Sequence, residues 1–438
     1  MFRLRLYQLL ALVALAGSTA QAQEVVLNSY EEAFERALEQ NFDLQNLTLD
    51  VQHAELEYKK QKNHKLPTIN GTFTGQRNLD LATTPLPAEI FGGEPGTTIN
   101  AQFGQEYTFN AGISVTKQFF DRKAKLNTRI SKLMVDRTQL EQELFEELLF
   151  EQVYLYYHTA LIAKKAVDLG ESDLKTAEQI SELTREKYKE GLLDASAEIN
   201  TSINENKIKQ GLNANQQLLA QCEIELKRLM GLKTSQRLEL TEAVDYELPE
   251  PLLNTTLKPD KSLATAQLEV DQADLQVKLS KAALLPTVSV SSYYGRQQFR
   301  NDFGLGLSSD DWNPYSYVSF NLNVPIFSGF KSKREIKQSK ISQEKTLNGQ
   351  QQREQESLLD DELLVANYNM SLRDATLGKE TYDLYKKQLE LSGQRLEEGL
   401  ISLDTHLGVF EDYLKAENAY LNSLSTLYSY YSQLEYRL

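Results

Sequence analysis

The side chains that most often carry out chemistry in proteins are few in this chain and lie far apart. The histidines do not show the His-x-x-x-His spacing of a zinc-binding helix; they are His53, His64, His158 and His406. No Gly-x-Ser-x-Gly elbow marks a nucleophilic serine, and no glycine-rich loop marks a phosphate site. The sequence therefore predicts a protein that is not an enzyme and that uses no metal or other cofactor.

The remaining reactive groups have simpler explanations than catalysis. Paired acids such as Glu146-Glu147 and Asp360-Asp361 could act as acid and base, but they lie in long helical patterns. Solvated helix faces or the lining of a tunnel explain them better. Cys222 is the single cysteine, so no internal disulfide can form, and its helical setting favours a buried small residue. The net charge of -15 argues against nucleic acid as a partner.

The elements that carry these residues occur twice along the chain. Leu66-Pro67-Thr68 recurs as Leu285-Pro286-Thr287, and Gly191-Leu192-Leu193 recurs as Gly399-Leu400-Ile401. The interval from Phe120 to Gly191 is nearly equal to that from Phe327 to Gly399. A repeat of this length is too long for a solenoid and indicates a duplicated structural half. We predict a first repeat over 23–230, a linker or equatorial region with a short strand over 231–260, and a second repeat over 261–438.

Each half predicts long helices that meet at a Gly-Leu turn. In the first half a helix over 29–65, with Ser29 and Glu32 as a capping box, ends at Leu66-Pro67. The segment 121–190 has no proline, and its leucines follow the steps of three, four and seven of a coiled-coil seam. A helix of ~70 residues is about 105 Å long. Gly191 ends it, and a further helix follows over 195–230; the second half predicts helices over 261–285 and 331–398 and a last one after Gly399.

Strands with alternating polar and apolar residues follow each Leu-Pro-Thr motif. They are predicted around 69–75 and 107–116 in the first half, and from 288 and over 318–324 in the second. Each is near the ~9–11 residues that a tilted strand needs to cross a bilayer. Four strands cannot close a barrel, whereas three chains would supply twelve. The alternative is a small soluble sheet with one wet face, but the secretory signal, the tyrosine-rich strand ends and the unequal outer loops favour the barrel.

The first 22 residues predict a secretory signal peptide. Arg3 and Arg5 precede the apolar run from Leu9 to Ala16, and Ala20-Gln21-Ala22 forms a small-x-small cleavage site. The run is too short to span a bilayer, and no later run of ~20 apolar residues predicts a transmembrane helix.

Taken together, the order of these motifs resembles the outer-membrane efflux protein family, which is TolC-like. The resemblance covers essentially the whole chain after the signal and is carried by the Leu-Pro-Thr junctions, the segment Val324-Pro325-Ile326-Phe327-Ser328-Gly329, the Gly-Leu turns, Leu407 and Ala416-Glu417. It implies a mainly helical fold with membrane strands. Three chains would form a twelve-stranded barrel in outer-membrane lipid above an α-helical barrel in the periplasm.

The resemblance also implies roles for the motifs. The helix-to-barrel junctions would be Leu66, Pro67, Thr68, Leu285, Pro286, Thr287 and Pro325. The periplasmic tips that contact an adaptor (a membrane fusion protein) fed by an inner-membrane transporter would be Gly191, Leu192, Leu193, Gly399, Leu400, Ile401 and Ser402. In the family, acids six and nine residues after the second glycine line the closed entrance, but here those positions are Thr405 and Gly408. An acidic constriction would then draw on Asp194, Glu198 and Asp404.

Two functions account for these features to different degrees. The first is a passive export channel of a tripartite efflux or type I secretion system, in the outer membrane of a Gram-negative-type bacterium. The second is a periplasmic coiled-coil scaffold or adaptor without a pore, which explains the helices but not strands of membrane length. Drugs, metal ions, siderophores and polypeptides are all cargo in the family, and the sequence leaves the choice among them open.

Overall fold

The computed structural model describes residues 24–242, 248–252 and 257–438, which divide into two compact units. The predicted signal peptide, residues 1–22, lies outside this range. Unit 1 comprises 24–50, 139–264 and 351–438, apart from the undescribed positions, and unit 2 comprises 51–138 and 265–350. Among the described helices, none has the length and apolar character needed to cross a membrane.

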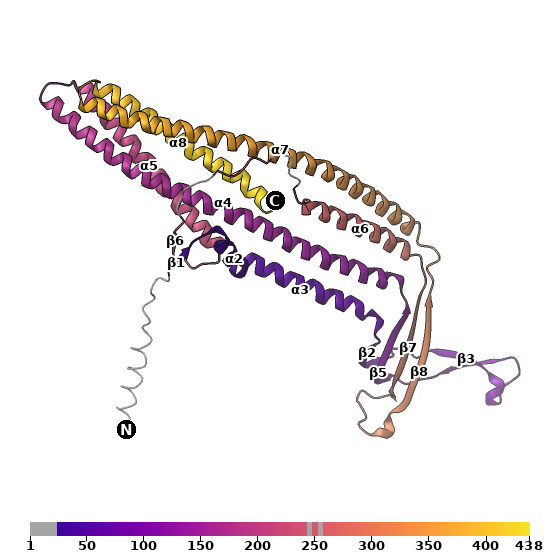
Figure 1. Ribbon diagram of the computed structural model, residues 1–438. Coiled ribbons are helices and arrows are strands. Elements are labelled where there is room, and N and C mark those ends of the chain that lie inside the picture. Colours follow the sequence, from indigo (N-terminus) through magenta and orange to yellow (C-terminus); the bar gives the residue numbers. More distant parts are fainter. Residues whose placement is uncertain (1–23, 243–247, 253–256) are drawn as a thin grey trace, which may run out of the picture. The chain divides into compact units, whose positions relative to one another are not determined.

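Unit 1 is built from two helical hairpins and a small parallel sheet (Figure 1). The first hairpin joins α4 (Arg122–Lys189) to α5 (Ala195–Leu229), and the second joins α7 (Lys331–Glu397) to α8 (Leu403–Glu435). The N-terminal parts of α4 and α7 belong to unit 2. The sheet pairs β1 (Glu24–Leu27) with β6 (Arg237–Leu240) in parallel register, Val25 against Leu238. The predicted strand near 238–240 is therefore confirmed, and its partner β1 was not predicted.

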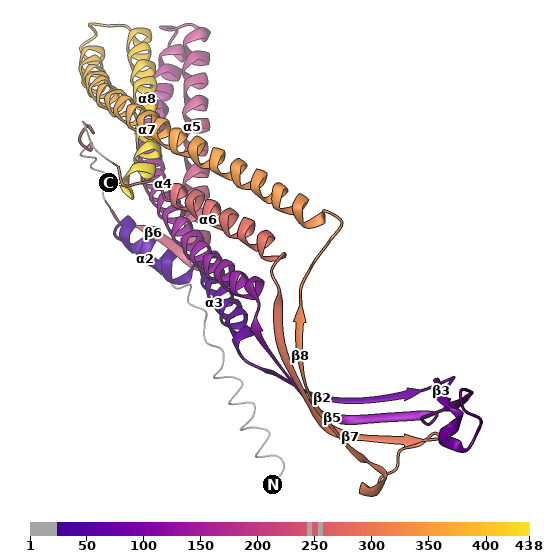
Figure 2. The same ribbon diagram turned by 90° about the vertical axis from the view of Figure 1, so that its right-hand side faces the viewer.

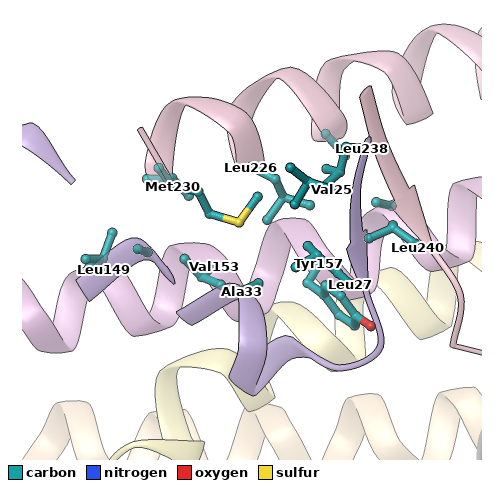
Figure 3. Packing of buried hydrophobic residues seen from close by; sticks show 14 of the residues in the cluster. Val25, Leu27, Ala33, Leu149, Val153, Tyr157, Leu226, Met230, Leu238 and Leu240 are labelled. Atoms are coloured by element: carbon teal, nitrogen blue, oxygen red, sulfur yellow. The ribbon is translucent and has the colours of Figure 1, made fainter. Parts of the chain in front are cut away.

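A buried core joins the small sheet to the first hairpin (Figure 3). Leu27 of β1 and Tyr157 of α4 are completely buried, as is Leu226 of α5. Tyr157 keeps its hydroxyl satisfied by donating to Glu242 at 2.8 Å. Burial of one side chain of this size stabilises the folded state by about 1.5–3 kcal/mol. This core therefore fixes the two strands of the sheet to the hairpin.

The predicted single helix over 29–65 is wrong in one respect, because it is broken at Asn41. The structure has α2 (Tyr30–Gln40), α3 (Phe42–Lys62) and a short 3-10 turn. Ser29 caps α2 as predicted, but Glu32 reaches back to the backbone N–H of Asn28 rather than to that of Ser29. At the break, the Asn41 side chain accepts the N–H groups of two residues in α3 and donates to the Leu229 carbonyl at 2.9 Å. At the break, the side chain of Asn41 thus provides an N-cap for α3 and a tertiary hydrogen bond in place of continuous helical hydrogen bonding.

Unit 2 contains a four-stranded antiparallel sheet, which is the predicted strand set (Figure 2). Its order is β2-β5-β7-β8, with bounds Thr68–Arg77, Tyr107–Phe120, Thr287–Arg300 and Asn313–Asn323. β5 and β7 have 14 residues each, longer than the ~10 predicted. Between β2 and β5 there is a second antiparallel pair, β3 (Thr83–Pro87) with β4 (Thr98–Gln102).

The Leu-Pro-Thr motifs lie where helix changes to strand in unit 2. Thr68 begins β2 directly after Leu66-Pro67, and Thr287 begins β7 after Leu285-Pro286, which follows α6 (Lys261–Ala282). Proline has no N–H for the helix ladder and biases the residue before it toward extended backbone, which is the conformation Leu66 adopts. Pro325 lies between β8 and α7. The predicted junction residues therefore occupy junctions, and their membrane role stays a prediction.

The two halves of the chain have matching elements. α4 and α7 have 68 and 67 residues, and α5 and α8 have 35 and 33. Each compact unit takes residues from both halves. The assignment of 23–230 and 261–438 as repeats stays a prediction.

Candidate functional site: the paired Gly-Leu turns

The first Gly-Leu turn, residues 190–194, joins α4 to α5 through a left-handed glycine. Gly191 has φ +74°, a value that L side chains rarely adopt. Its N–H donates to the Tyr188 carbonyl at 2.9 Å, and the N–H of Leu192 donates to the Lys187 carbonyl at 2.9 Å. This is the Schellman arrangement, which satisfies carbonyls that the end of α4 would otherwise leave without partners.

The second Gly-Leu turn, residues 398–402, repeats this geometry between α7 and α8. Gly399 has φ +71°, its N–H donates to the Leu396 carbonyl at 3.0 Å, and the N–H of Leu400 donates to the Arg395 carbonyl at 2.8 Å. A helix that must reverse direction here needs a residue without a Cβ penalty at the left-handed position. The repeated sequence therefore produces a repeated backbone structure.

Each turn presents one apolar side chain to solvent. Leu192 and Leu400 are both 68% exposed. Leu193, by contrast, packs against the core below the turns. The two turns therefore each leave one leucine exposed on a backbone that is fixed by hydrogen bonds.

A shared core holds the two turns in one region of unit 1. Ile180 of α4, Ile208 of α5 and Phe410 of α8 are buried together, with Tyr382 of α7 packed against them. Figures 1 and 2 both show the two turns at the same end of the helices. The structure thus brings the two sets of predicted tip residues together.

The predicted entrance acids lie just beyond the turns and have local partners. Asp194 caps α5 by accepting the Ala197 N–H at 3.1 Å, and its bond from Ser196 lowers the pKa of its carboxyl. Glu198 lies 3.6 Å from the guanidinium of Arg185. Exposed ion pairs of this kind contribute little to stability.

The corresponding positions of the second turn are mostly polar but uncharged. Ser402 caps α8 by accepting the Thr405 N–H at 3.2 Å, and its hydroxyl lies 2.8 Å from that of Thr405. Asp404 is exposed in the first turn of α8, and Gly408 is exposed with open space around it. Thr405 thus serves the helix cap, and whether these positions form a constriction stays a prediction.

One histidine lies directly below the second turn. His406 is 7% exposed, and its Nδ1 lies 2.8 Å from the Ser392 hydroxyl of α7. Burial lowers the pKa of His406. A neutral imidazole therefore joins the two helices of the second hairpin near the turn.

Sequence reasoning did not single out a buried pair of acids further from the turns. Asp173 of α4 precedes Gly191 by the same interval at which Glu417 of α8 follows Gly399. That equal spacing was the available signal. Within the described ranges, no group of three or more metal-ligating side chains comes together.

Comparison with known proteins assigns a family to this geometry. The outer membrane efflux protein family matches residues 33–232 and 252–435. The chain belongs to this family. The cation efflux system protein CusC of Escherichia coli O157:H7 is 21% identical over 330 residues, covering 74% of this chain and 67% of CusC. The toluene efflux pump outer membrane protein TtgI of Pseudomonas putida is 22% identical over 440 residues, covering 91% of this chain and 83% of TtgI.

Solved structures of outer-membrane channels share the fold. The Campylobacter jejuni CmeC outer membrane channel has a TM-score of 0.74 at 15% identity and covers 92% of this chain and 84% of its own. The outer membrane protein VceC of Vibrio cholerae has a TM-score of 0.72 at 14% identity, with coverage of 93% and 95%. The predicted fold class, mainly helical with a membrane sheet, is confirmed.

Family membership confirms the predicted location and the kind of protein. The chain is an outer-membrane efflux protein with a large helical part in the periplasm. The family consists of channel proteins rather than enzymes. The alternative of a periplasmic scaffold without a pore has no support from these relatives.

Proposed function

We propose that this outer-membrane efflux channel works as a homotrimer that connects a periplasmic adaptor and an inner-membrane transporter to the outside. The observation that carries the proposal is the open sheet of unit 2. Its edge strands are β2 and β8, and every residue of β2 is exposed. Unpaired edges are not tolerated in lipid, so the sheet must pair with other copies.

Three copies of this four-stranded sheet would supply twelve strands. The alternation supports a lipid-facing surface, because Phe320 and Leu322 on β8 are exposed and alternate with Asn321 and Asn323. In a barrel, one face of each strand meets lipid and the other meets the lumen. The membrane therefore accounts for apolar side chains that water would leave unfavourably exposed.

The adaptor would contact the two Gly-Leu turns. Leu192 and Leu400 offer matched apolar groups, and the turns around them are fixed by backbone bonds. Leu193, Ile401 and Ser402 complete these turns. The acids Asp194, Glu198 and Asp404 lie beside them and would place negative charge at an entrance, with Thr405 and Gly408 in the positions that carry acids in the family.

Transport through the channel would be passive, because the sequence has no phosphate-binding loop that could couple it to nucleotide hydrolysis. The cation and toluene pumps among the relatives differ in cargo, and the adaptor and transporter that this chain meets would decide its own cargo.

The proposal is tested by purifying the full chain in detergent. We expect a trimer by light scattering and stepwise conductance in planar bilayers. A monomer that stays in the periplasmic supernatant after cell fractionation would contradict it.

The turns are tested by substituting valine for the left-handed glycines. Gly191→Val and Gly399→Val each force a β-branched residue into positive φ at a cost of about 1–2 kcal/mol. Open space surrounds both positions, so the strain stays in the backbone of the turn. We expect drug export to fall while trimers still assemble.

The matched control is Gly349→Val, because Gly349 also has open space but lies in α7 without positive φ. Export should remain at the wild-type level in this control. Equal drug susceptibility in all three variants would contradict the assignment of the turns to the adaptor site.

A further inference from the structure

Inside unit 1, two acids from different hairpins face one another. Asp173 of α4 and Glu417 of α8 are 7% and 5% exposed, and their carboxyl groups are hydrogen-bonded to each other. The Tyr413 hydroxyl donates a further bond to Glu417 Oε2 at 2.6 Å. Two ionised carboxylates have only acceptor oxygens, so this contact requires one proton between them.

The neighbouring charges determine which acid keeps the proton. Lys165 of α4 and Lys386 of α7 favour the ionised form of Glu417, as does its bond from Tyr413. Burial is the largest cause that raises the pKa of Asp173, to about 8, and the charge of Glu417 adds to it. Burial also raises the pKa of Glu417. Asp173 is thus the protonated member, and its O–H donates to Glu417.

The other elements around the pair complete its electrostatic surroundings. From α7, the Tyr382 ring lies 5.7 Å from the Tyr413 ring. From α5, Lys207 lines the adjoining cavity, and from α8, Glu411 and Lys415 do so. Within the described residues that line the cavity, these are the charged groups besides the acid pair itself.

The adjoining cavity gives the pair access to water. It has a volume of about 530 Å³ and lies among α4, α5 and α8, and both acids are part of its wall. Buried Asn204 contributes a further polar group. A cavity of this size with several polar groups in its wall has room for several water molecules, so a proton can leave without unfolding the helices.

We propose that the Asp173–Glu417 carboxyl pair adds to the buried core in holding the two hairpins together only while it shares a proton. Release of that proton to water leaves two carboxylates in contact inside a buried site. Like-charge repulsion and the cost of desolvation then oppose the contact. Separation of α4 from α8 relieves both, because water from the cavity can hydrate the two groups.

The direction of the pH dependence follows from the proton count. The closed arrangement binds the proton and the separated one does not, so a lower pH favours the closed arrangement. Between the ordinary carboxyl pKa of about 4 and pH 8 the ratio of separated to closed molecules should rise by about tenfold per pH unit, and above pH 8 it should level off. Both acids lie about five helical turns, or about 27 Å, from their turn glycines, so separation would also move the Gly-Leu turns apart. An effect on the channel entrance rests on the proposed function.

The experiment measures the distance between the hairpins in the full chain. Spin labels are placed at Lys189→Cys and Asp404→Cys, both exposed, after Cys222→Ala removes the native thiol. Labelled chain is diluted into unlabelled chain so that each distance lies within one molecule. We expect a longer distance to gain population between pH 7 and pH 9 in the wild type.

Asp173→Asn supplies a permanent donor to Glu417, so its distance should stay short across this range. Asp412→Asn, an exposed acid of the same helix, should follow the wild type. The proposal would be overturned if the distance in the wild type did not change with pH. It would also be overturned if the distance in Asp173→Asn changed with pH as it does in the wild type.

A second measurement covers the case in which Asp173→Asn does not fold. Infrared titration of the wild type should show a protonated carboxyl band that is lost near pH 8, and its absence would also overturn the proposal. Bilayer conductance separates the two proposals. A distance that depends on pH, without conductance, would support the proposal for the carboxyl pair and contradict the proposed channel. Conductance with a distance that does not change with pH would support the channel and contradict the proposal for the carboxyl pair.

Discussion

Replacing His158 should change how the stability of unit 1 responds to acid. His158 is 7% exposed and lies among aromatic rings, stacked on Tyr428 with centroids 4.5 Å apart and next to Tyr154 at 4.3 Å. Neither ring nitrogen has a hydrogen-bond partner among the described residues. Burial lowers the pKa of His158 to about 4, although Glu31 acts in the opposite direction.

The size and sign of the effect follow from that pKa. An unfolded histidine has a pKa of about 6.5, so the unfolded chain binds the proton more readily than the folded one. Stability is therefore complete at neutral pH, falls as the pH drops below about 6.5, and stops falling below about 4. Between pH 7.5 and pH 5 this one group should remove about 2 kcal/mol from the free energy of unfolding.

The assay is urea unfolding of the detergent-solubilised chain at pH 7.5 and pH 5. His158→Phe keeps an aromatic ring in the stack but has no proton to bind. Its free energy of unfolding should gain about 2 kcal/mol relative to the wild type when the pH is lowered. Titrating groups that do not interact with His158 act equally on both proteins and cancel in the comparison.

His53→Gln is the control, because His53 is exposed on α3. Its difference from the wild type should be the same at both pH values. If the wild type and His158→Phe also differ equally at pH 7.5 and pH 5, the argument from burial is refuted.

Two further substitutions test the packing of each unit. Gly112→Val should prevent assembly in the outer membrane, because a Cβ at Gly112 would lie 2.7 Å from the backbone carbonyl oxygen of Tyr294 and from the Tyr293 ring. Gly71→Val, where nothing lies within 4 Å, should assemble normally, as heat-dependent gel migration would show. Equal assembly of both would argue against the packing of this sheet. Asn41→Ala removes a helix cap and the bond to the Leu229 carbonyl, and should lower the free energy of unfolding by about 1–3 kcal/mol in urea titrations; a loss below about 0.5 kcal/mol would contradict its structural role.

Much of the local structure could be predicted because it depends on neighbouring residues. The absence of proline between 121 and 190 permits a long helix, and the glycines at 191 and 399 permit the left-handed ends that the structure shows. The strands follow from alternation, and the junctions follow from proline. The turn residues of the candidate site were located in this way, since each motif shapes the backbone next to it.

The misses involve elements that local pattern does not define. The strand β1, Glu24–Leu27, is too short to show a period, and it forms by pairing with β6, which lies in the predicted linker, 231–260. The break at Asn41 occurs in a segment with a helical pattern, and its bond to Leu229 is what makes the break stable. Tertiary contacts outweigh helix propensity there.

The sequence by itself determined the lengths of the long hairpin helices, the places where they turn and the order of helix and strand, because steric and hydrogen-bonding limits act over a few residues. Only the tertiary structure decided which side chains meet across the hairpins. The equal spacing of Asp173 and Glu417 from the turn glycines does not show that the two acids meet, and they become a pair that must share a proton only when α4 and α8 bury them together. Burial and the approach of distant charges are properties of the folded chain, and they determine the chemistry of this pair.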